Sequence, residues 1–314
     1  STHRHTLFPY TTLFRSLYLA WAIAEHMATP AATRGLLKAS LGGENSAGCV
    51  VAMLAVIAWT ALLRAGVSLT HQSLSGDRLQ KALVAAAPWG LLLFLSLGAL
   101  SLTGSRGGAG AALLGLLAAT AAMVVGERTN RRAILVIMIA TGAAIVCFVG
   151  LIIATGATGA RLSRLDFVLA NRGEILSIYA AKLADAPWTG FGLGTFRHFN
   201  ALLVAPGGHE VLWDLGALHN VYLQWILEGG WPGALLMFGT VAALIVTALG
   251  GLRRRRFGRT WIVGATAVSV VVLAQGLIDF GLQSPAIASL WALTLGLGAG
   301  VSRPERTSKP SSID

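Results

Sequence analysis

The sequence predicts an all-α protein: a polytopic bundle of transmembrane helices with one large periplasmic loop that contains short helices. Hydrophobic residues make up 55% of the 314 residues, and charged residues make up only 12%. A soluble domain carries about a quarter charged residues. Several apolar runs exceed the ~18 residues that a helix needs to cross a bilayer. Most basic residues lie in the short connections between those runs, as membrane topology requires.

The apolar runs predict about seven or eight helices, separated by turn-like polar clusters. A first, partial helix is expected at 17–29. Residues 1–16 resemble translated adapter sequence and are expected to be non-native, so the native chain would begin inside a helix with upstream helices missing. The further helices are expected at 47–69, 82–103, 108–125, 133–155, 231–251, 261–280 and 285–302.

These runs divide the chain into a membrane domain in two parts, a loop and a tail. The N-terminal part of the membrane domain is expected at 17–155 and the C-terminal part at 219–302. Between them, residues 156–218 form the polar loop, and residues 303–314 form a cytoplasmic tail.

The basic residues predict the orientation. With the Arg253–Arg259 loop in the cytoplasm, alternation places fourteen Lys and Arg inside and three in the short outer loops. The net charge of +11 therefore reflects topology and contact with anionic membrane lipids, not a nucleic-acid partner. The same alternation brings a set of polar residues to the outer, periplasmic face, and the set comprises Asn45, Arg106, His219, Asp279, Gln283 and the 156–218 loop.

The outer loop contains a predicted helix. Asn171 and Glu174 fit a capping box, so the helix is expected to begin at Arg172 and to end before Pro187. Arg172 shares a helix face with the apolar Ile175, and an arginine on such a stripe needs an anionic partner. That partner is either a phosphate or a structural carboxylate.

Three side chains are candidates for chemistry. The guanidinium groups of Arg172 and Arg106 present a planar fork that suits phosphate oxygens. Arg106 is equally explained as an interfacial arginine whose head group reaches water. Histidine side chains can act as a base or an acid, which makes His219 a candidate, although a single histidine at a helix start is more often structural.

Other polar and glycine residues are expected to be structural. Glu228 lies on the opposite side of a straight helix from His219, so it is expected to fix the helix break at the following G-G-W-P-G. Gly190, Gly192 and Gly194 follow Pro187 with no preceding strand, which indicates a tight turn rather than a nucleotide loop. The acidic residues and the two cysteines are too scattered to predict a metal site.

Several segments of the chain after residue 16 resemble the O-antigen ligases and polymerases of bacterial envelopes. The resemblance rests on L-T-G-S-R-G-G, on R-G-E-I-L-S-I-Y-A-A-K-L-A-D-A-P-W-T-G-F-G-L-G-T-F, and on H-N-V-Y-L-Q followed by E-G-G-W-P-G. S-L-G-G-E-N-S-A-G and L-I-D-F-G-L-Q-S-P are similar to two further family segments.

The resemblance implies an inner-membrane, inverting glycosyltransferase that uses neither a metal nor a cofactor. Its donor would be a glycan linked to undecaprenyl pyrophosphate, and its acceptor a hydroxyl of the lipid A core or of another glycan. Arg106 and Arg172 would hold the pyrophosphate, and His219 would activate the acceptor. The remaining implied roles are substrate binding for Asn45, Asn220 and Tyr222 and a structural role for Asp279.

Two alternatives remain open from the sequence. Apolar helices with few buried charges also fit a membrane transporter, and inorganic-carbon carriers share this signature. A transporter is expected to show internal repeats and polar, broken helices at the bilayer midplane, whereas the polar residues here gather at one end. The second alternative is a non-catalytic scaffold of an envelope-assembly complex.

Overall fold

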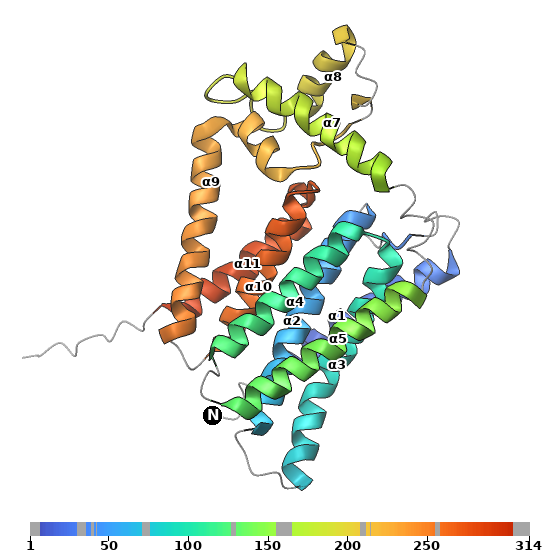
Figure 1. Ribbon diagram of the computed structural model, residues 1–314, viewed down its shortest axis with the longest axis vertical. Helices are drawn as coiled ribbons and strands as arrows, with labels where there is room; N and C mark the ends of the chain where they lie inside the picture. The colour runs from blue at the N-terminus through green and yellow to red at the C-terminus, as the bar shows by residue number, and fades with distance from the viewer. Residues whose placement is uncertain are drawn as a thin grey trace, which may run out of the picture.

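The computed structural model describes residues 7–29, 36–38, 41, 43–70, 76–126, 130–154, 165–207, 212–213, 215–254 and 258–303. Every regular element in these ranges is a helix, which confirms the all-α prediction (Figure 1). The α-helices are α1 (Leu7–Ala28), α2 (Glu44–Thr70), α3 (Gly76–Thr103), α4 (Arg106–Gly126), α5 (Arg131–Ala154), α7 (Leu165–Ala184), α8 (Phe196–Gly207), α9 (Val221–Arg254), α10 (Arg259–Gly276) and α11 (Pro285–Ser302), and a short 3₁₀ helix, η4, spans Gly281–Gln283.

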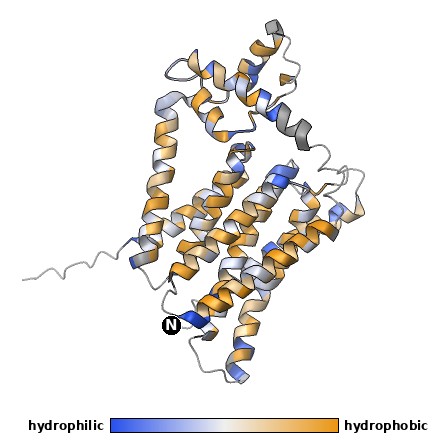
Figure 2. Cartoon of the chain, viewed as in Figure 1, coloured by the Kyte–Doolittle hydropathy of each residue, from blue (hydrophilic) through white to orange (hydrophobic). Residues whose placement is uncertain are grey.

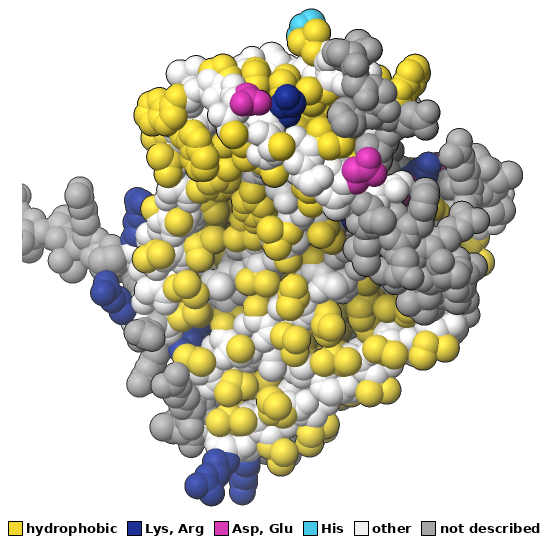
Figure 3. All heavy atoms as spheres, turned by 45° about the horizontal axis from the view of Figure 1, so that its top comes forward, with side chains coloured by type: hydrophobic (Ala, Val, Ile, Leu, Met, Phe, Trp, Pro, Cys, Tyr) yellow, Lys and Arg dark blue, Asp and Glu magenta, His cyan; other side chains and the backbone are white. Residues whose placement is uncertain are grey.

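Seven of the described helices are long and apolar enough to cross a membrane, and they are α2, α3, α4, α5, α9, α10 and α11. Figure 2 shows hydrophobic residues along the length of these helices, and Figure 3 shows many of them on the outside of the molecule. The predicted helical bundle is therefore confirmed. Apolar side chains cover the surface because the surrounding solvent would be lipid rather than water.

The bundle is built around α2 and α10. In an apolar stretch of 18 residues of each helix, 78% of the residues are buried in α2 and 61% in α10, against 17% in α5. Small residues allow close helix packing: a Cβ on Gly115 of α4 would overlap Val271 of α10 and lie 2.7 Å from Val56 of α2. Polar side chains inside the bundle bond to one another, since Trp59 donates to Thr120 at 3.2 Å.

The two ends of the bundle differ in charge and in chemistry. At one end, Asn130 donates to Thr70 and Arg259 donates to the Leu252 carbonyl, which brings the basic connections together. The opposite end joins the start of α2 to the start of α4 and the start of α9 to the end of α10. The basic and the candidate-site residues therefore lie at opposite ends, as alternation predicted.

Helices α7 and α8 form an outer layer beyond the second of these ends (Figure 1). This layer has a small core of its own, which comprises Ile175, Tyr179, Phe196, Leu212, Leu218 and Leu227. Burial raises the pKa of Tyr179, so its hydroxyl stays protonated and donates to Asn200. Helix α9 connects the layer to the bundle and breaks at Gly230, where φ is 63° and ψ is −175°.

Three predicted boundaries were wrong. Helix α7 begins at Leu165, not at Arg172, because the preceding apolar residues continue the helix and Asn171 and Glu174 are tolerated inside it. Helix α1 begins at Leu7 and crosses the expected boundary at residue 16. His219 precedes α9 instead of beginning it. The predicted end of α7 before Pro187 is confirmed.

Candidate active site

The start of α9 is held by Asn220. Its side-chain oxygen accepts a hydrogen bond from the Leu223 backbone N–H at 2.9 Å, so Asn220 is the N-cap of the helix. Its amide nitrogen donates to the Leu277 carbonyl at 3.1 Å, just after α10 ends. Asn220 therefore fixes the junction of α9 and α10, and it places the neighbouring His219 there.

His219 is paired with Asp279. The His219 Nδ1 and Asp279 Oδ1 atoms are 3.1 Å apart, and the side chains are 32% and 1% exposed. The carboxylate favours the proton on Nδ1, a tautomer inferred from the contact, and this leaves Nε2 free to accept a proton. The Phe280 ring lies 5.2 Å from the imidazole, between ring centroids. The pair has the arrangement of a general base oriented by a carboxylate.

A second polar group lies at the start of α4. Ser105 is the N-cap of this helix, because its hydroxyl oxygen accepts from the Gly108 N–H at 3.0 Å. The same hydroxyl donates to the side-chain oxygen of Asn45 at 3.0 Å, which ties the start of α2 to that of α4. Arg106 is the first residue of α4, and its side chain is exposed.

Helix α10 joins the two polar groups. A Cβ on Gly107 would lie 2.5 Å from Ile278 Cδ1 and 3.2 Å from Gln275 Oε1, so the first turn of α4 lies against the end of α10. Helices α2, α4, α9 and α11 all begin at this end of the bundle. Their N-termini carry the positive ends of the helix dipoles, which favour an anionic ligand.

Arg172 lies in the outer layer, apart from both groups. It is half-buried on α7, one turn before Ile175 on the same face, and it makes no hydrogen bond or ion pair with another described residue. Helix α7 lies beyond the ends of α4 and α10 (Figure 1). The structure therefore brings His219, Asp279 and the Arg106 turn to one end of the bundle, with Arg172 on the layer above them.

Tyr222, a predicted substrate-binding residue, packs between helices. Its hydroxyl donates to the Leu273 carbonyl of α10 at 2.7 Å, and its ring lies 5.5 Å from that of Phe238, between centroids. Both contacts hold α9 in place. The structure thus shows a packing role for Tyr222.

Glu228 organises the loop between α7 and α8. Its carboxylate accepts from the backbone N–H groups of Gly194 at 3.1 Å and Phe196 at 3.3 Å, and from the Gln224 amide at 3.1 Å. Phe196 begins α8, so the carboxylate lies at the positive end of that helix. Glu228 has no contact with His219 and fixes the loop instead.

The loop itself begins with a tight turn. The Gly190 N–H donates to the Pro187 carbonyl at 2.8 Å, and Gly190, Gly192 and Gly194 have φ values of 77°, 106° and 76°. Side chains are strained at such angles, which is why glycine recurs there. We call residues 188–194 the strap. It runs along α9 at the Gly230 break, since the Trp231 N–H donates to the Trp188 carbonyl.

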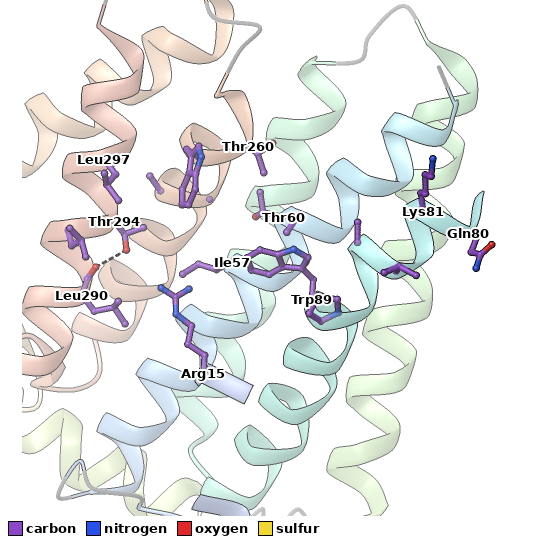
Figure 4. Close-up of a pocket in the computed structure, with 18 of the residues that line it drawn as sticks. Arg15, Ile57, Thr60, Gln80, Lys81, Trp89, Thr260, Leu290, Thr294 and Leu297 are labelled. Carbon is purple, nitrogen blue, oxygen red and sulfur yellow. Dashed lines mark hydrogen bonds between the residues drawn. The ribbon is translucent and has the colours of Figure 1, made fainter. Parts of the chain in front are cut away.

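A cavity of about 1010 Å³ lies elsewhere in the bundle (Figure 4). It is lined mainly by apolar residues of α2, α3, α10 and α11, including Ile57, Trp89, Trp261 and Leu290. Lys81, near the start of α3, also lines it, so the cavity extends toward the basic end. None of the candidate site residues lines this cavity, and its volume alone assigns it no role in the chemistry.

The His219–Asp279 pair is the feature that sequence reasoning missed. Sixty positions separate the two residues, and no local pattern connects them. The signal that was present is an aspartate at the end of an apolar run, because a carboxylate at the edge of a membrane needs a partner. The sequence predicted a structural role for Asp279 but did not identify His219 as its partner.

A family model described as O-antigen ligase matches residues 91–238. The match includes Arg106, Arg172, His219 and Glu228, and it ends before Asp279. No curated protein sequence matches the chain. With its seven membrane-capable helices the chain is a multi-pass membrane protein, and its residues 91–238 are similar to the O-antigen ligase family.

Proposed function

We propose that the chain is an inverting glycosyltransferase that moves a glycan from undecaprenyl pyrophosphate to an acceptor hydroxyl at the periplasmic face of the inner membrane. The match of residues 91–238 to the O-antigen ligase family model supports a glycosyltransferase-type enzyme. The observation that carries the finer proposal is the contact between His219 and Asp279 at the outer end of the bundle. The acceptor is the lipid A core or another glycan.

The pair supplies the base that an acceptor hydroxyl needs. The Nε2 atom of His219 takes the hydroxyl proton while the acceptor oxygen bonds to the anomeric carbon. The bond from that carbon to the diphosphate oxygen breaks, and undecaprenyl pyrophosphate leaves. Attack from the face opposite the leaving group inverts the anomeric centre. Asp279 stabilises the imidazolium that forms, because its carboxylate already accepts the Nδ1 hydrogen bond.

Arginine side chains and helix N-termini would stabilise the leaving group. Negative charge grows on the diphosphate as the glycosidic bond breaks, so cations placed beforehand lower the barrier. Arg106 stands at the N-terminus of α4, where backbone N–H groups also favour an anion. Arg172 would act from α7, which overlies this end of the bundle.

Replacing either arginine is expected to weaken the use of the donor. A hydrogen bond to a charged group contributes about 1.5–3 kcal/mol, so Arg106→Ala and Arg172→Ala should each lower kcat/KM for the donor roughly 10-fold to 150-fold. The lysine variants should recover only part of this loss, because lysine lacks the bidentate fork. Transfer from a polyprenyl-diphosphate glycan in proteoliposomes measures both.

The control is Arg64→Ala, which removes an exposed arginine on α2 far along the helix from its site end. Its kcat/KM should equal that of the unsubstituted chain. Unchanged transfer by Arg172→Ala would show that Arg172 does not bind the donor. Unchanged transfer by both alanine variants would show that neither arginine takes part in the mechanism.

Impermeant cysteine labelling tests the proposed orientation. In a background with Cys49 and Cys147 replaced by alanine, Leu193→Cys should react with a membrane-impermeant maleimide on intact spheroplasts, because Leu193 is 79% exposed on the strap. Arg303→Cys, at the exposed end of α11, should react only after lysis. The reverse pattern would place the candidate site in the cytoplasm, where the proposed donor head group does not reside.

A further inference from the structure

Two neighbouring residues at the candidate site carry buried polar atoms without partners. Both polar atoms of the Gln275 amide and the Oδ2 atom of Asp279 are covered and make no hydrogen bond with a described residue. Each residue is only 1% exposed. Buried polar groups are nearly always paired, because an unpaired one loses its bonds to water without replacement. These three atoms therefore need hydrogen-bond partners, which a bound ligand can supply.

One of the unpartnered atoms, Oδ2 of Asp279, belongs to the partner of the candidate base. Helix α10 ends at Gly276, and the Ile278 N–H donates to the Gln275 carbonyl at 3.0 Å in the turn that leads from Gln275 to Asp279. A Cβ on Gly107 would lie 3.4 Å from the Gln275 amide nitrogen, which places the amide at the first turn of α4. The other oxygen of Asp279 contacts His219. Asp279 therefore connects the Gln275 turn with the candidate base.

The atoms favour a hydroxyl group over a phosphate. The Gln275 amide offers donors and one acceptor, and the ionised Asp279 oxygen accepts only. A phosphate cannot donate to the two acceptors, and the carboxylate would repel it. Sugar hydroxyls both donate and accept, so they can satisfy the Gln275 amide as well as the Asp279 oxygen. Phe280 supplies an apolar surface beside His219.

The Ile278 side chain lies at the same turn of α4 as the Gln275 amide, since a Cβ on Gly107 would lie 2.5 Å from its Cδ1. The residue is 38% exposed, and a partly exposed side chain changes rotamer within nanoseconds. We expect such a change to open access to the amide.

We propose that Gln275 and Asp279 Oδ2 form a subsite for sugar hydroxyls next to His219. This inference rests on the proposed function and names residues that hold the sugar rather than the diphosphate. The sugar belongs to the donor, as the residue bonded to the diphosphate, or to the acceptor, as the residue that carries the reacting hydroxyl. The same hydrogen-bonding groups would bind the sugar of the donor or the sugar of the acceptor.

Gln275→Leu tests the subsite. The substitution replaces an unpaired buried amide by an apolar group of similar size, so the Tm should be equal to or above that of the unsubstituted protein. The KM for one substrate should rise roughly 3-fold to 10-fold, as expected for a lost neutral hydrogen bond. A higher KM for the acceptor assigns the sugar to the acceptor, and a higher KM for the donor assigns it to the donor.

A deoxy-sugar series makes the test specific. The unsubstituted chain should use a substrate that lacks the contacted hydroxyl roughly 3-fold to 10-fold less well, and Gln275→Leu should not distinguish the two substrates. The matched control is Gln283→Leu in η4, whose side chain is exposed at the same end of the bundle. It should keep the full discrimination of the unsubstituted chain.

Several outcomes would overturn the subsite alone. Unchanged KM values for both substrates in Gln275→Leu would do so, as would a lowered Tm with unchanged KM, which assigns the amide a structural role. If the leucine variant does not fold, equal use of every deoxy sugar by the unsubstituted chain overturns the inference. Absence of glycan transfer by the unsubstituted chain contradicts the proposed function instead, so the two failures are distinct.

Discussion

His219→Ala is expected to lower kcat for glycan transfer about 10²-fold to 10⁴-fold, the range that general-base catalysis contributes. The KM for the donor should change little, because the imidazole acts on the acceptor proton and not on the diphosphate. Single-turnover transfer from a polyprenyl-diphosphate glycan measures the chemical step. His198→Ala is the matched control, since His198 is an exposed histidine of α8.

Asp279→Asn tests the same base through its partner. The amide keeps the size of the carboxylate but cannot stabilise an imidazolium, and an amide NH₂ facing Nδ1 favours the wrong tautomer. The fall in kcat should approach that of His219→Ala, and the double variant should lose little more, because the two residues act as a unit. Asp185→Asn, on an exposed loop, is the control.

Full activity in both His219→Ala and Asp279→Asn would contradict the base assignment. Additive losses in the double variant would contradict the pairing while leaving each residue a separate role. Equal kcat values for Asp279→Asn and the unsubstituted chain, with a large loss in His219→Ala, would show that the carboxylate does not orient the base.

The membrane helices could be predicted because their signal is strong and local. An apolar run longer than the bilayer is thick predicts one helix. The direction of each helix, which the basic connections indicate, stays a prediction. The start of α7 could not be predicted in this way. The capping pattern at Asn171 is compatible with a helix interior as well as with a helix start, and only the upstream residues decide between them.

The candidate site was predictable only in part. Arg106 and His219 stand in short sequence motifs, so sequence alone could propose them as candidates, and their roles stay predictions. The contact between His219 and Asp279, and the place of Gln275 beside Gly107, depend on how α4, α9 and α10 pack. Packing brings together residues that are 60 positions apart. No periodic pattern in the sequence indicates which residues of the packed helices come into contact.

Gly190→Ala is expected to have the largest effect on stability, because the strap contacts α9 through glycine backbone. Gly190 has a φ of 77°, which costs another residue about 1–2 kcal/mol. A Cβ there would overlap the backbone of Gly230 and of Glu228. Moving the strap away would break the bonds from Phe191 N–H to the Leu227 carbonyl at 2.8 Å and from Gly192 N–H to the Glu228 carbonyl at 2.9 Å.

The combined loss should reach about 2–5 kcal/mol, from the strained φ and the broken hydrogen bonds. Of the membrane helices only α9 takes part in these bonds, at its end next to the outer layer, so the outer layer should open first. Limited proteolysis between α7 and α8 should become faster in Gly190→Ala, and the Tm should fall. Gly233→Ala is the control, since Gly233 is helical with open space around it, and alanine there should be neutral or stabilising. Equal proteolysis rates for the two variants would show that the strap does not hold the outer layer. If they differ as expected, the layer that carries Arg172 depends on this junction, and glycan transfer should fall together with it.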